Sequence, residues 1–197
     1  MRKLALLTWL LLPILAGAYH YGPGQERLKL DDAATALKLA DQAVARGDHE
    51  SALLHYDDAL GFLPKEKIDE ARRIRLEKNK AQMEAKQLPA AHAELKSLVD
   101  ELVADGKGDS KIAKEARAAL ANSQYYMTWL MRLEGVAREQ WEPEIEAARQ
   151  SLKLLADTAE ESGDAKAAKT HTEDLESVIR LARMDLGELQ GLPLPSQ

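Results

Sequence analysis

The sequence has no cysteine, one phenylalanine and few aromatic residues, which make up 5% of its 197 residues. Without cysteine there are no disulfides or thiolate ligands, and lipid attachment through a thiol is excluded. A net charge of −6 argues against a nucleic-acid partner, because phosphate contacts require a basic face. Gly-rich phosphate loops, His-Glu-x-x-His and Gly-x-Ser-x-Gly are also missing. The sequence therefore predicts no catalytic residues and no cofactor.

The first eighteen residues differ from the rest of the chain. Arg2 and Lys3 precede an apolar run, Leu4–Ala18, which ends in Ala-Gly-Ala. This pattern is typical of a secretory signal peptide, and the run is shorter than the roughly 18–20 residues of a spanning helix. We expect residues 1–18 to be removed and the protein to be secreted or periplasmic. Because aromatic Tyr19 and Tyr21 follow, a retained N-terminal membrane anchor is the alternative.

The remainder is rich in Ala, Leu, Glu, Lys, Arg and Gln, and it shows no alternation typical of strands. Proline and glycine divide it into segments, with Pro64, Pro89 and Pro143 at predicted boundaries. About seven helices are predicted, over 30–46, 49–62, 65–86, 89–104, 110–134, 142–162 and 164–187. Short connections make successive helices antiparallel neighbours, so the predicted fold class is all-α. Segments 19–29 and 191–197 are predicted to be a flexible linker and a disordered tail.

One unit of 34 residues, Ala33–Glu66, carries a recognisable spacing. Its characteristic positions are Leu39, Ala40, Gly47, Ala52, Tyr56, Ala59 and Pro64. The alanines are small where two helix backbones approach, and Tyr56 fills the space beside them. This unit resembles a tetratricopeptide repeat, although Ala36 and Ala43 replace two aromatic residues of that family.

Looser copies of the pattern follow. In one copy Ala91 and Leu95 occupy repeat positions and Lys86 replaces the turn glycine. A later copy includes residues 152–175, with Thr172 replacing the aromatic residue. The resemblance implies one helical-repeat domain over 30–190, an α-solenoid of helix hairpins. The sequence leaves open how the last three predicted helices pair.

The segment Arg46–Pro64 also contains two histidines and two aspartates. His55 and Asp58 are three residues apart on one helix face, which is compatible with a pair of metal ligands. A metal ion requires three or four ligands, and the histidines outside this segment are far away in sequence. We interpret these residues as part of the repeat, and no metal site is predicted.

Two stretches are candidates for binding a partner. The basic run Glu70–Lys80 places Arg72, Arg75 and Lys78 where an acidic peptide could bind, and a solvated helix face is the alternative.

The second stretch, Gln124–Gly135, has more apolar residues than one buried helix face needs. Either this helix is buried on two sides, or its C-terminal turns extend past their neighbours and expose a patch. The residues of that patch would include Tyr125, Tyr126, Trp129 and Met131.

Together these observations predict an exported repeat scaffold that binds a protein or peptide and has no catalytic activity. Two alternatives remain: a membrane-anchored assembly factor that retains residues 1–18, and a small helical enzyme or ligand carrier. The sequence determines neither the partner nor the oligomeric state.

Overall fold

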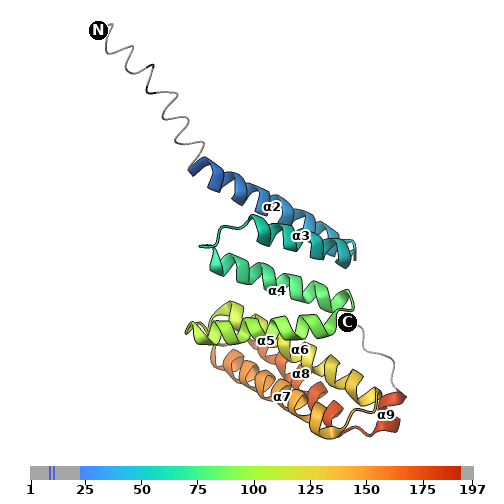
Figure 1. Cartoon of the computed structure of the whole chain (residues 1–197). Helices are drawn as coiled ribbons and strands as arrows, with labels where there is room; N and C mark the ends of the chain where they lie inside the picture. The colour runs from blue at the N-terminus through green and yellow to red at the C-terminus, as the bar shows by residue number, and fades with distance from the viewer. Residues whose placement is uncertain (1–8, 10, 12–22, 192–197) are drawn as a thin grey trace. The chain divides into compact units, whose positions relative to one another are not determined.

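The computed structural model describes residues 9, 11 and 23–191, and within these ranges the chain forms helices and no strand. The helices are α2 (Pro23–Ala45), α3 (His49–Phe62), α4 (Ile68–Glu84), α5 (Leu88–Ala104), α6 (Lys111–Leu133), α7 (Arg138–Glu161), α8 (Ala165–Arg183) and α9 (Leu186–Gln190). Helices joined by a short turn pack side by side, as α2 with α3 and α6 with α7 (Figure 1). The predicted all-α array of helix hairpins is confirmed, and the short α9 is an addition to the seven predicted helices.

Several predicted boundaries differ from the observed ones, those at the start of α2 and the end of α8 among them. α2 begins at Pro23 rather than near residue 30, so residues 23–29 are helical and not a linker. Proline suits the first position of a helix, where its missing N–H has no intrahelical acceptor, and the following Gln, Glu, Arg, Leu and Lys favour helix. The predicted helix 164–187 ends at Arg183, because Met184 is extended and Asp185 begins α9.

Pro143 marks no boundary. It lies inside α7, which begins at Arg138. A proline this close to the start removes only the N–H that would bond the Glu139 carbonyl. Both residues are exposed, so water can satisfy that carbonyl and the helix continues.

The chain divides into two compact units within α4, between Ile74 and Arg75. The single repeat domain expected over 30–190 stays a prediction. In a helical array each helix packs mainly on its sequence neighbours, so separate compact units form readily along one chain. The predicted cleavage site after Ala18 and the predicted tail after Gly191 lie outside the described residues.

In the first unit, α2 and α3 pack through small side chains. Ala40, Ala43, Ala52 and Ala59 are fully buried, and Tyr56 is buried beside them. The small side chains allow the two helices to approach closely, as the repeat spacing required. Leu39, by contrast, is 42% exposed, so this repeat position does not contribute to the core.

The turns of two hairpins share one local geometry. Gly47 and Gly163 have positive φ, and the aspartate that follows each of them begins the next helix. The Asp48 carboxylate accepts from the Ser51 N–H at 3.1 Å, and Asp164 accepts from the Ala167 N–H at 3.0 Å. These are N-caps that satisfy a free helix N–H. The α2–α3 and α7–α8 turns therefore share one local geometry.

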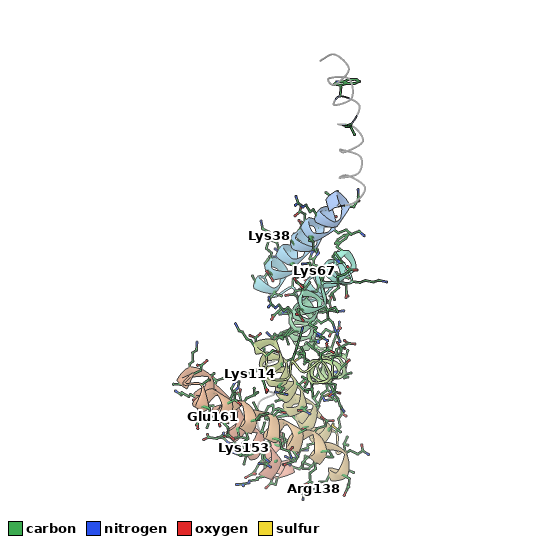
Figure 2. The ribbon with its side chains drawn as sticks, turned by 90° about the vertical axis from the view of Figure 1, so that its left-hand side faces the viewer. Lys38, Lys67, Lys114, Arg138, Lys153 and Glu161 are labelled. Atoms are coloured by element: carbon green, nitrogen blue, oxygen red, sulfur yellow. The ribbon has the colours of Figure 1, made fainter. Side chains whose placement is uncertain are left out.

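The second unit has two hydrophobic clusters, and α6 contributes to both. Leu76 and Met83 of α4 pack with α5 and with the first half of α6. Trp129 of α6 packs with residues of α7, α8 and α9 in the other cluster. Residues on two faces of α6 are therefore buried, which explains its high apolar content. Figure 2 labels Arg138, Lys153 and Glu161, which mark the start, the middle and the end of α7 in this unit.

Within residues 9, 11 and 23–191, no helix combines the length and apolar character needed to cross a bilayer. In the same ranges, no three His, Asp or Glu side chains converge in the way that a metal ion would require.

Candidate functional site

A cavity of 280 Å³ in the second unit is bordered by α6, α7 and α8. These three helices are neighbours in Figure 1. The cavity is lined by Ala118, Ala121, Asn122, Tyr125, Tyr126, Leu152, Asp174, Ser177 and Val178. Ala121, Leu152 and Val178 are buried and form an apolar floor, whereas Asn122, Asp174 and Ser177 are exposed at its open side. We call this feature the α6–α8 cavity.

The lining follows from helical periodicity. On α6, residues 118, 121, 122 and 125 are three or four positions apart, so they share one face. On α8, Asp174, Ser177 and Val178 are spaced in the same way. Alanine at 118 and 121 leaves room where a larger side chain would fill the contact between helices. The space is therefore a consequence of small residues at two positions of α6.

Two tyrosines form one wall of the cavity. Their rings meet edge to face, with 5.4 Å between centroids and 79° between planes, and the Tyr125 ring lies 5.9 Å from that of Trp129. Desolvation raises the pKa of Tyr125, the negative charge that Tyr126 gains when it ionises raises it further, and Arg180 lowers it. Desolvation, Glu84 and Asp174 raise the pKa of Tyr126. Both phenols are therefore neutral at pH 7 and offer rings and hydroxyl groups.

Asp174 is the charged residue among those that line the α6–α8 cavity. Its carboxylate makes no hydrogen bond or ion pair with the described residues, whereas the Ser177 hydroxyl donates to the Glu173 carbonyl at 3.0 Å. Desolvation raises the pKa of Asp174, Glu173 raises it further, and His171 lowers it. A carboxylate without a protein partner, at the open side of an apolar space, is a natural contact for a ligand donor.

The predicted exposed patch at Gln124–Gly135 is corrected by the position of Trp129, which is 5% exposed and packs against α7, α8 and α9. The turn that carries Trp129 therefore does not overhang, although the neighbouring Leu130 is 38% exposed. Met131 is half-buried, as are Tyr125 and Tyr126, but only the two tyrosines line the α6–α8 cavity.

The basic run does not form a free cationic surface. Arg72 is 6% exposed and lies 3.7 Å from the Asp69 carboxylate. The guanidinium of Arg75 donates two hydrogen bonds to Glu101, at 2.8 and 3.0 Å, and these bonds raise the pKa of Arg75. Lys78 is half-buried. The guanidinium groups at 72 and 75 face carboxylates of the protein, so the run is a poor candidate for an acidic peptide.

A second polar cluster joins three helices on the same unit. The Glu144 carboxylate of α7 accepts from the Gln124 amide of α6 at 3.1 Å, and it lies 3.1 Å from His92 Nε2 of α5. Glu144 is the shared partner of both side chains, and the cluster borders none of the described cavities. This arrangement fixes α5, α6 and α7 together and has the character of a structural network.

Sequence reasoning found the two tyrosines but missed Asn122, Asp174 and Ser177. Asp174 and Ser177 are about fifty positions after the tyrosines, and each resembles any other polar residue on a solvated helix. Their proximity depends on how α6, α7 and α8 pair, which the sequence left open. No family model, no curated protein and no solved structure matches this chain.

Proposed function

We propose that this protein is a non-catalytic helical-repeat scaffold that binds a peptide segment of another protein at the α6–α8 cavity. The observation that carries this proposal is the lining of the cavity, an apolar floor with two tyrosines and three exposed polar side chains at its open side. Such a combination buries part of a ligand and orients it through few polar contacts. The resemblance of Ala33–Glu66 to a tetratricopeptide repeat supports the same function, because repeat arrays commonly present binding surfaces.

The open side of the cavity favours a peptide over a small-molecule substrate or cofactor. Pockets for small molecules usually measure about 300–1,000 Å³ and enclose most of the ligand. The α6–α8 cavity is open on one side, where three of its lining residues are exposed, so it can enclose one or two side chains of a longer segment and not a whole small molecule. The rest of that segment would then lie along the surfaces of α6 and α8.

A phage-displayed library of random peptides, selected on the immobilised full chain, tests the proposal. Asn122→Phe would fill the open side of the cavity without disturbing its buried floor. Gln150→Phe is the matched control, because Gln150 is an exposed amide on α7 that does not line the cavity. Enriched peptides should bind the native chain and Gln150→Phe equally, and bind Asn122→Phe about tenfold or more weakly.

Two results would contradict the proposal. Equal binding of the enriched peptides to both variants would place the binding surface elsewhere. Failure of the library to yield any peptide that binds the native chain would overturn peptide binding as the function. Circular dichroism of each variant shows whether its helical fold is intact.

A further inference from the structure

The α6–α8 cavity has the chemistry to hold a long side chain with a charged end. Ala118, Ala121, Leu152 and Val178 offer aliphatic contacts along the floor, and the polar residues are at the open side. Lysine and arginine side chains have this division, with apolar stems and a polar end that remains near water.

The charge among the lining residues determines whether a cationic or an anionic side chain fits the cavity. Among the lining residues Asp174 is the charged one, and its carboxylate has no hydrogen bond or ion pair with the described residues. Glu173 precedes it in sequence and Glu84 acts on Tyr126, so both add negative potential. His171 and Arg180 act in the opposite direction on Asp174 and Tyr125, and neither these two residues nor the two glutamates line the cavity. The carboxylate of Asp174, which does line it, therefore sets the sign.

The tyrosine rings add a second interaction for a cation. Aromatic faces attract ammonium and guanidinium groups, and the attraction strengthens where water is partly excluded. Tyr125 and Tyr126 are half-buried, their rings meet edge to face, and they line the same cavity as the Asp174 carboxylate. A carboxylate together with aromatic rings is therefore complementary to a basic side chain and not to an acidic one.

We propose that the α6–α8 cavity binds a lysine or arginine side chain of the partner peptide, with the cation paired to Asp174 beside Tyr125 and Tyr126 and the aliphatic stem on the alanine floor. This inference rests on the proposed function of peptide binding, and it identifies the chemical class of the residue that the cavity recognises.

The test uses two small probes and the ¹⁵N-labelled full chain. Nα-acetyl-lysine methylamide carries the charged end, and Nα-acetyl-norleucine methylamide has a similar stem without it. The lysine probe should produce saturable chemical-shift changes at the backbone amides of Asn122, Tyr125 and Ser177, which the norleucine probe should not reproduce. Raising the salt concentration should weaken the binding of the lysine probe, because the pair is partly exposed.

Asp174→Asn should weaken binding of the lysine probe about tenfold, because it removes the charged acceptor and conserves the shape. Glu161→Gln is the control; it removes one negative charge from the exposed end of α7 (Figure 2), and binding should not change. Equal binding of both probes, or equal effects of both variants, would overturn the proposal.

The result separates this inference from the proposed function. If peptides selected from the library compete at the cavity but tolerate replacement of each basic residue by norleucine, peptide binding stands and the recognition of a basic side chain is refuted. If the lysine probe binds at the cavity and no peptide does, the site is one for a free amine, and both the peptide function and this inference are refuted.

Discussion

Arg132 offers the sharpest test of how the second unit is held together. Its guanidinium, near the end of α6, donates to the carbonyl oxygens of Leu181 and Met184, at the end of α8. These carbonyls belong to the last turn and the residue after it, where no helix N–H follows to bond them. The same guanidinium lies 4.8 Å from the centre of the Trp141 ring. Arg132 thus joins three helices through one side chain.

The expected cost of Arg132→Met follows from these contacts. A hydrogen bond from a charged donor contributes about 1.5–3 kcal/mol, and Arg132→Met removes two of them. Water can reach these part-buried carbonyls, and its hydrogen bonds to them offset part of the lost free energy. A cation at a helix C-terminus contributes about 0.3–1 kcal/mol, and a cation above a ring contributes about 0.5–1 kcal/mol. Methionine conserves the aliphatic packing. We expect the free energy of unfolding of the second unit to fall by about 2–4 kcal/mol.

Arg138→Met is a matched control because Arg138 lies 6.0 Å from the same ring. It is exposed and pairs with Glu142, and such surface ion pairs are screened by solvent, so its removal should leave the free energy of unfolding nearly unchanged. Urea unfolding followed by tryptophan fluorescence, in a Trp9→Phe background, reports the second unit through its two remaining indoles. A cost for Arg132→Met within about 0.5 kcal/mol of the control would refute this account of the α6–α8 connection.

Three further predictions concern stability. Gly47→Ala should lower the free energy of unfolding by about 1–2 kcal/mol, because Gly47 has a φ of 72°. Gly61→Ala should raise it by about 0.5–1 kcal/mol, because Gly61 is helical and its new Cβ meets nothing within 4 Å. Opposite shifts in the melting temperatures of the two variants check this pair. Ala52→Leu should overpack the fully buried contact of α2 with α3 and cost about 1–3 kcal/mol in chemical unfolding, and an unchanged midpoint would contradict this. Hydrogen bonds from Arg149, and then from Gln150, lower the pKa of Glu146 from 4.5 to about 2. The stability that the ionised Glu146 contributes is therefore present above pH 4.5 and is lost as the pH falls toward 2. In Arg149→Met, NMR titration should show the pKa of Glu146 returning toward 4.5.

The helices could be predicted because their signals are local. The ends of α3, at His49 and Phe62, match the prediction, since Gly47, Asp48 and Pro64 lie next to those ends in sequence. Helix boundaries were predicted wrongly where a local rule allows two positions for the same residue. Pro143 is compatible with the second turn of a helix as well as with its start, and Pro23 is compatible with a helix start as well as with a linker.

The binding candidates were predicted less well, because composition does not give burial. Trp129 and Tyr126 lie in one apolar stretch, yet Trp129 packs with α7, α8 and α9, whereas Tyr126 packs on the cluster of α4 and α5 and lines the cavity. Arg72 looked like a surface cation, and it is buried. Export and partner binding stay predictions, since the first rests on residues 1–18 and the second awaits the peptide selection.

The sequence by itself determined the elements of this protein, since helix propensity, capping and turn chemistry act over a few neighbouring residues. Only the tertiary structure decided which faces of those elements meet. Alanine at 118 and 121 reads as ordinary helix sequence until α7 and α8 pack beside α6 and leave an open space there. Asp174 becomes distinctive for the same reason, because only the packing of helices brings a carboxylate from α8 next to tyrosines some fifty positions earlier.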